Sequence, residues 1–188
     1  IEPVIVFTKT DLAYDEAYDA KKMYEHIGIH TFMSDINNND VVIALKEFLN
    51  DKICVFTGNS GVGKSTLINK LISNLNLQTG PISRKLGRGK HTTRQVELLK
   101  FGDGYIADTP GFSFIDVKRM TQLSSENIVY GFVEFAKYAQ QCKFISCTHM
   151  CEKGCRVIQA VEEHKIYRSR YESYVRMVKD LKAAKKRR

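Results

Sequence analysis

The chain has 188 residues, 43% of them hydrophobic, and a formal net charge of +8 at pH 7. This length suffices for one well-packed core, or for one core and a small second domain. With no apolar run long enough to cross a bilayer and no visible secretory signal, we expect a cytoplasmic protein without a membrane partner. The chain opens directly in an apolar run, residues 4–7, which indicates part of a longer protein.

The positive charge is concentrated in the last third of the chain. Residues 1–118 carry 14 basic and 14 acidic side chains, whereas residues 119–188 carry 15 basic and 7 acidic ones. A local excess of positive charge attracts polyanions. We therefore expect the C-terminal third to bind RNA, and the alternative is a solvated basic surface that keeps the protein soluble.

Strand and helix patterns alternate in the first part of the chain. Short apolar runs predict strands at residues 4–7, 30–33, 53–57, 97–101 and 105–107, the last two forming an antiparallel hairpin. Amphipathic periodicity predicts helices at residues 15–27, at 41–50 with Asp40 as N-cap, and at 65–77. Residues 34–40 predict a polar turn and residues 78–95 a mobile loop. Such alternation is typical of an α/β fold with a doubly wound, mostly parallel sheet.

The pattern changes after residue 118. Residues 119–141 predict one or two helices, in which Phe132, Phe135 and Tyr138 are spaced as core residues. Residues 157–184 predict one long basic helix, whose tyrosines either stack on RNA bases or pack against the domain. We therefore expect two domains, residues 1–118 and residues 119–188.

A P-loop pattern lies between the third predicted strand and the third predicted helix. Its glycines let backbone amides surround phosphates at a helix N-terminus, Lys64 neutralises phosphate charge, and Ser65 offers a hydroxyl to Mg²⁺. The predicted phosphate-binding residues are Gly58, Asn59, Ser60, Gly61, Val62, Gly63, Lys64, Ser65 and Thr66.

Residues 108–111 form a DxxG motif downstream of the P-loop. Asp108 is expected to hold Mg²⁺ through water, and the Gly111 amide to contact the γ-phosphate. A switch threonine that binds Mg²⁺ belongs in the loop between them, where Thr93 is the first candidate and Thr92 the second.

A TKxD motif, which is typical of guanine recognition, precedes the P-loop by about fifty residues. Asp11 would accept hydrogen bonds from guanine N1–H and its amino group, with Lys9 packed along the base and the P-loop. Thr8 stands where Asn is more usual, and Ser34 begins the turn expected near guanine O6. Ordinary GTPases have the P-loop first and this motif last, so the order predicts a circularly permuted GTPase.

Four of the five cysteines lie between residues 142 and 155. Three thiols and an imidazole fit a closed tetrahedral zinc site of structural type, with ligands Cys142, Cys147, His149 and Cys155. Cys151 is a surplus thiol that either replaces a ligand or stays free. Cys54 stands alone in an apolar strand and is expected to be a small buried thiol.

These features resemble the RsgA (YjeQ) family of circularly permuted GTPases over essentially the whole chain, in the motifs TKTD, TGNSGVGKSTLIN, GRGKHTTR and DTPGF and in the Cys/His cluster. The resemblance implies a Ras-like GTPase domain, a helical zinc domain, and GTP hydrolysis stimulated by the 30S ribosomal subunit during its late assembly. An N-terminal OB-fold domain of the family is absent from these 188 residues.

The resemblance also implies that His91 orients or activates the hydrolytic water. Ras-like enzymes use a Gln just after DxxG, but Phe112 occupies that place here. The implied partners are GTP or GDP with Mg²⁺, the 30S subunit and its 16S rRNA, and we expect a monomer. The alternative is a non-catalytic RNA-binding module that responds to guanine nucleotides. Asp11 argues against an ATP-using enzyme.

Overall fold

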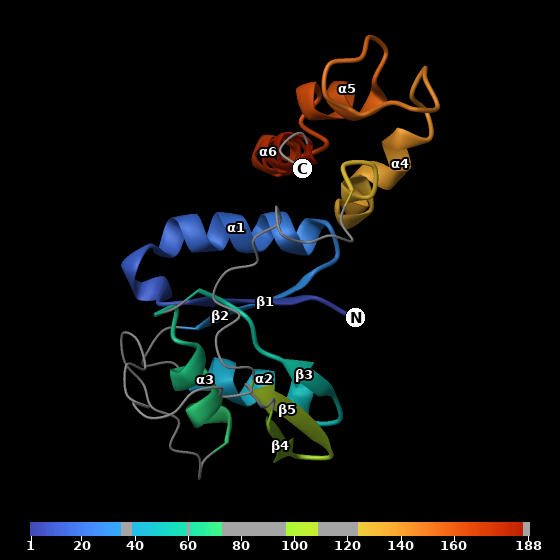
Figure 1. Ribbon diagram of the computed structural model, residues 1–188. Helices are drawn as coiled ribbons and strands as arrows, with labels where there is room; N and C mark the ends of the chain where they lie inside the picture. Colours follow the sequence, from blue (N-terminus) through green and yellow to red (C-terminus); the bar gives the residue numbers. More distant parts are fainter. Residues whose placement is uncertain (35–38, 60, 73–96, 109–123, 186–188) are drawn as a thin grey trace. The chain divides into compact units, whose positions relative to one another are not determined.

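The computed structural model describes residues 1–34, 39–59, 61–72, 97–108 and 124–185 (Figure 1). Its chain divides into two units, Ile1–Ile115 and Asp116–Arg188, which are described separately below. No helix among the described residues is both long enough and apolar enough to cross a membrane.

All five predicted strands are present in the first unit. They are β1 (Val4–Thr8), β2 (His30–Ser34), β3 (Ile53–Val55), β4 (Glu97–Phe101) and β5 (Gly104–Asp108). β1 pairs with β2 and β3 pairs with β5 in parallel, while β4 and β5 form the predicted antiparallel hairpin. The described strands hydrogen-bond as two sheets, in the orders β1-β2 and β3-β5-β4, rather than as one continuous sheet.

The helices of the first unit follow the predicted order. They are the short η1 (Thr10–Leu12), α1 (Tyr14–His26), α2 (Asp40–Leu49) and α3 (Lys64–Leu71). Asp40 is not the N-cap of α2, because Asn39 occupies that position and Asp40 begins the helix. α3 ends at Leu71, where Ile72 turns to extended backbone, so the predicted end at residue 77 is too late. The predicted turn at residues 34–40 lies partly, and the loop at 78–95 wholly, outside the described residues.

Helices cover both faces of the β1–β2 pair (Figure 1). Because side chains alternate along a strand, Phe7 faces α1, where its ring lies 6.3 Å from that of Tyr24. On the opposite face, the ring of Phe32 lies 5.6 Å from that of Phe48 on α2. That second face joins a buried core shared with α3 and with Ile106 of β5. One core therefore holds both sheets of the first unit.

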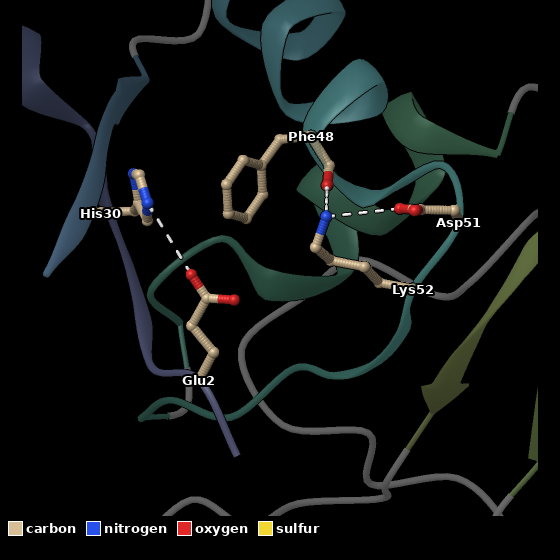
Figure 2. Close-up of polar contacts among 5 residues, drawn as sticks. All are labelled: Glu2, His30, Phe48, Asp51 and Lys52. Carbon is tan, nitrogen blue, oxygen red and sulfur yellow. Dashed lines mark hydrogen bonds and ion pairs between the residues drawn. The ribbon is translucent and has the colours of Figure 1, made fainter.

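Lys52 lies between the end of α2 and the start of β3, and its side chain contacts the last turn of α2 (Figure 2). Its Nζ donates to the Phe48 carbonyl oxygen at 2.8 Å, lies 4.7 Å from the centre of the Phe48 ring, and pairs with Asp51 at 3.3 Å. Carbonyl groups in the last turn of a helix lack intrahelical partners and favour a cation. On the other side of the Phe48 ring, His30 lies 5.1 Å away and pairs with Glu2 at 3.7 Å. The Lys52 contacts therefore fix the turn between α2 and the strand that precedes the P-loop.

The second unit consists of short helical turns followed by two helices. Its elements are η3 (Ile128–Gly131), η4 (Val133–Phe135), α4 (Ala136–Ala139), α5 (Arg156–Glu162) and α6 (Arg168–Lys185). The predicted single helix over residues 157–184 is wrong. His164 adopts a left-handed backbone with φ 57°, and the amides of Lys165 and Ile166 both donate to the Ala160 carbonyl oxygen. This turn buries Ile166, which a continuous helix would place differently.

Aromatic rings form the centre of the second unit, as predicted. Phe132 and Phe135 are buried, and each ring lies within 5.3 Å of the ring of Tyr174. Tyr138 is partly buried against the same cluster. The short turns keep these rings three residues apart on one side of the chain, so the core prediction holds although the helices are shorter than expected.

Candidate functional site

Four strand ends of the first unit lead into the motifs found in the sequence. The carboxyl end of β1 continues into Lys9, that of β3 into the P-loop, and that of β5 reaches Asp108. Ser34, the last residue of β2, is buried and lies beside Thr8 in the parallel register. Parallel strands place their carboxyl ends at one edge of a sheet, which is where α/β proteins bind ligands.

Two hydrogen bonds join the TKxD motif to the P-loop across more than fifty residues of sequence. Thr8 Oγ1 donates to the Val62 carbonyl oxygen at 2.5 Å, and Lys9 Nζ donates to the Gly61 carbonyl oxygen at 2.7 Å. Lys9 itself adopts a left-handed backbone with φ 56°, which turns the chain sharply after β1. The predicted base-reading and phosphate-binding segments therefore lie side by side, with Asp11 exposed to solvent next to them.

The P-loop backbone requires its glycines. Gly61 and Gly63 have φ of 81° and 96°, a region that residues with a Cβ rarely adopt. A Cβ on Gly58 would lie 3.1 Å from Val62, so this close turn also favours glycine. Gly63 is the N-cap of α3, and Lys64 and Ser65 follow in the first turn of that helix. Unpaired amides and a positive dipole end therefore point from α3 to the space that a phosphate would fill.

Several predicted site residues lie outside the described part of the chain. These residues are Ser60, His91, Thr92, Thr93, Arg94, Gly111 and Phe112. The backbone of Asp108 is described as the last residue of β5, next to the strand pair β3–β5. Among the described residues, the structure thus brings together the TKxD motif, Ser34 and most of the P-loop.

The four predicted metal ligands converge in the second unit. Their ligand atoms all lie within 4.8 Å of one another. His149 Nδ1 lies 3.6 Å from Cys142 Sγ and 3.4 Å from Cys155 Sγ, and the two sulfur atoms are 3.9 Å apart. Bonds of about 2.0–2.3 Å to a tetrahedral zinc ion would separate neighbouring ligand atoms by roughly 3.5–3.8 Å. The donor types and their spacing therefore fit a structural zinc ion.

The side chains of this cluster differ in how readily they take the form that binds metal. Burial raises the pKa of the Cys147 thiol to about 12 and lowers the pKa of His149 below its ordinary value. The neutral imidazole is the form that binds metal, and a coordinating thiol gives up its proton to a divalent cation. The amide of Arg156 donates to Cys142 Sγ at 3.4 Å, which suits a thiolate.

The two remaining cysteines lie apart from these ligands. Cys151 is exposed and does not belong to the cluster, which favours the predicted alternative of a free thiol. Cys54 is half-buried rather than fully buried, with Sγ 3.6 Å from the Tyr105 carbonyl oxygen. Its burial raises the pKa of the thiol.

Glu152 organises the segment around His149, residues 147–151, which we call the ligand loop. The sequence patterns did not mark this residue. Its carboxylate accepts hydrogen bonds from the amides of Thr148, Met150 and Cys151 at 2.8–3.1 Å, and from the Thr148 hydroxyl. Burial acts to raise the pKa of Glu152, but these hydrogen bonds outweigh burial and lower it to about 2. The same hydrogen bonds hold the backbone of His149 in a left-handed conformation with φ 55°. The one sequence signal was a single acid among basic neighbours between the cysteines.

Two tyrosines of α6 close the same loop from the other side. Tyr171 Oη donates to the His149 carbonyl oxygen at 2.9 Å, and Tyr174 Oη donates to the Thr148 carbonyl oxygen at 2.8 Å. Both rings therefore pack inside the domain, as one of the two predicted alternatives required, whereas the third tyrosine of the predicted helix, Tyr167, is exposed. Arg170, one of the basic residues of the C-terminal third that we expected to bind RNA, instead forms an ion pair with Glu134 at 2.7 Å over the Phe132 ring.

We expect Glu152→Gln to destabilise the second unit at pH 7 by about 2 kcal/mol, because an amide replaces a carboxylate that accepts charge-assisted hydrogen bonds. The folded pKa of about 2 lies below the ordinary 4.5, so the carboxylate stabilises above pH 4.5 and loses this effect as pH falls toward 2. Because acid also protonates the metal ligands, the stability difference between wild type and variant is measured by denaturant unfolding between about pH 6 and 8, where it should stay constant. Glu162→Gln on α5 is the control, and an equal loss there would contradict the assignment.

A family model described as RsgA GTPase matches residues 1–118. Small ribosomal subunit biogenesis GTPase RsgA 2 of Oceanobacillus iheyensis is 41% identical over 191 aligned positions, covering 100% of this chain and 64% of the relative. The RsgA protein of Clostridium beijerinckii is 42% identical, covering 96% and 62%. The chain therefore spans less than two thirds of the length of these relatives.

Two solved structures share the fold. YloQ, described as a circularly permuted GTPase, has a TM-score of 0.77 and 30% identity, covering 96% of this chain and 57% of the other. YjeQ from Thermotoga maritima has a TM-score of 0.76 and 33% identity, covering 96% and 60%. The motif order in the sequence and the strand arrangement agree with the circular permutation.

Proposed function

The chain belongs to the RsgA GTPase family, and from this premise we propose that it hydrolyses GTP to GDP and phosphate and that hydrolysis is coupled to late maturation of the small ribosomal subunit. The circularly permuted α/β fold and the names of its relatives support the proposal. Residues 1–118 would form the GTPase domain and residues 119–188 a zinc-binding domain, a division supported by the range of the family match.

One observation carries the proposal: Lys9 Nζ contacts the Gly61 carbonyl oxygen, so the TKxD segment adjoins the P-loop. A single nucleotide that reaches from Asp11 to Lys64 would have its base at the end of β1 and its phosphates at the start of α3. An adenine offers no donor pair to the Asp11 carboxylate, whereas guanine offers N1–H and its amino group. The arrangement would therefore select guanosine nucleotides.

The phosphate end would work by positioning and charge. Lys64 and the P-loop amides would hold the β- and γ-phosphates, and Ser65 with Thr93 would bind the Mg²⁺ that accompanies GTP. Asp108 would contact the ion through water, and the Gly111 amide would contact the γ-phosphate. His91 is the proposed group that orients water, because Phe112 cannot. Binding of GTP would order the segment around Thr93 and hydrolysis would release it.

The second domain would bind the ribosome and so bring the GTPase domain to it. Its basic excess suits the phosphates of 16S rRNA, and the relatives are named for biogenesis of the small subunit. We propose that the protein acts as a monomer in the cytoplasm. The 30S subunit would stimulate hydrolysis when it binds.

The test compares multiple turnover of GTP, ATP and xanthosine triphosphate with and without 30S subunits. We expect wild type to use GTP alone and to respond to 30S. Asp11→Asn should lose GTP affinity on the order of 100-fold or more, because two hydrogen bonds to a charged acceptor are lost. The same variant should gain affinity for xanthosine triphosphate. Asp15→Asn on α1 is the matched control. Equal use of ATP and GTP by wild type would refute base reading, and no turnover with 30S would leave a non-catalytic nucleotide-responsive module.

A further inference from the structure

The loop between the first two metal ligands is held rigidly by its neighbours. This segment, residues 143–146, is called the knuckle loop and follows α4 (Figure 1). The amide of Lys143 donates to the Gly154 carbonyl oxygen at 3.2 Å, and the amide of Cys147 donates to the Phe144 carbonyl oxygen at 3.2 Å. Gly154 has φ 79°, and a Cβ there would lie 3.2 Å from Lys143 Cβ. The backbone of the loop is therefore fixed at both ends.

This rigid loop presents two large apolar side chains to solvent. Phe144 is 48% exposed and Ile145 is fully exposed. Elsewhere in the unit, the rings of Phe132 and Phe135 are buried. Adjacent apolar side chains on a fixed, exposed loop mark a contact surface more often than a lone exposed residue does.

Positive charge predominates in the sequence on both sides of this apolar tip. The basic side chains between residues 137 and 156 are Lys137, Lys143, Lys153 and Arg156. Glu152 is the sole acid of that segment, and its oxygens accept hydrogen bonds from the ligand loop. A zinc ion together with three thiolate ligands would carry a single net negative charge, so the basic side chains still leave the segment positive. Lys143 Nζ lies 5.6 Å from the centre of the Phe144 ring, so a cation accompanies the aromatic face.

We propose that the knuckle loop binds unpaired RNA, with a base stacked on Phe144 and packed beside Ile145, and with adjacent phosphates neutralised by Lys143 and Lys153. This inference rests on the proposed function and adds a contact residue to it. Unpaired bases offer flat π-faces to aromatic side chains, and their phosphates complement the lysines. Fully paired RNA hides those faces, so it should not engage Phe144.

A single tryptophan reports this contact directly, because the chain contains none. We would titrate Phe144→Trp with a single-stranded RNA of about twelve nucleotides and mixed sequence, a length within known site sizes. Stacking should quench the tryptophan emission, whereas the paired duplex of the same sequence should not. Tyr130→Trp, at an aromatic position that is 80% exposed in the same unit, is the matched control and should stay unquenched.

Affinity measurements with the same labelled RNA separate stacking from charge. Phe144→Ala should weaken binding about tenfold without changing the salt dependence. Lys143→Ala should reduce the slope of log affinity against log salt by about 0.7, the value for one phosphate of a single strand. Both variants should retain their zinc content and their basal GTP hydrolysis.

Each remaining outcome decides against a defined part of the proposal. Quenching by duplex as strong as by single strand, or unchanged affinity in Phe144→Ala, would overturn the knuckle-loop assignment. Emission from Phe144→Trp that is already typical of a buried indole without RNA would show that protein covers the loop, which also overturns it. RNA binding that fails while GTP turnover persists rejects this inference alone, whereas RNA binding without turnover rejects the proposed function alone.

Discussion

Replacing Cys155 with serine should release the zinc ion and unfold the second unit. Cys155 is 5% exposed, its Sγ lies 3.4 Å from His149 Nδ1, and the residue is the N-cap of α5. Structural zinc sites contribute apparent binding free energies of about 10–16 kcal/mol at pH 7. A domain of this size obtains only about 3–5 kcal/mol from its core. The metal therefore outweighs the packing of the aromatic rings, and losing one of four ligands leaves the unit without sufficient stability.

The measurement is zinc content per chain together with circular dichroism and amide exchange of the second unit. Removing zinc from wild type with a strong chelator should give the same result, and returning zinc should restore the fold. Cys151→Ser is the matched control, because Cys151 is exposed and outside the cluster. A folded, zinc-containing Cys155→Ser, or a Cys151→Ser that loses its zinc, would show that the ligand set is wrong.

Lys64→Ala should reduce GTP hydrolysis at least about 100-fold, the scale on which preorganised charge stabilises a transition state. Lys64 begins α3 directly after Gly63, whose φ of 96° turns the chain into the helix. Its ammonium group would lie beside the β- and γ-phosphates, where negative charge shifts during transfer. Alanine favours helix, so the variant should keep α3 and the fold.

Single-turnover kinetics with excess enzyme separate the chemical step from loss of nucleotide affinity. Lys70→Ala in the last turn of the same helix is the control and should keep the wild-type rate. Equal losses in both variants would point to damage of α3 rather than to phosphate chemistry. A Lys64→Ala enzyme with the wild-type rate at saturating GTP would remove this lysine from the mechanism.

Local patterns predicted most of the secondary structure, because their physical causes are local. Short apolar runs formed β1 and β2, and the two glycines around Asp103 formed the β4–β5 hairpin. The long C-terminal helix was wrong for a tertiary reason. Residues 157–184 have helix-favouring composition throughout, but burial of Ile166 and the left-handed turn at His164 divide them into α5 and α6.

The metal ligands were predictable because cysteine and histidine spacing is itself the chemical signal. The residues that hold the ligand loop in place were not predictable, because their hydrogen bonds to backbone groups depend on how the loop folds. Nothing in the spacing of Glu152 or Tyr174 marks them as partners of Thr148. Arg170 illustrates the opposite error, since its charge suited RNA while its side chain is held by Glu134.

The sequence by itself determined which residue types are available for binding phosphate, guanine and zinc, and in which unusual order they follow one another. Only the tertiary structure decided which of them meet. The bond from Lys9 to Gly61 joins residues 52 positions apart, and the four metal ligands gather within 4.8 Å. Motifs are encoded by local composition, whereas proximity arises from burying a shared core, which is a property of the whole chain.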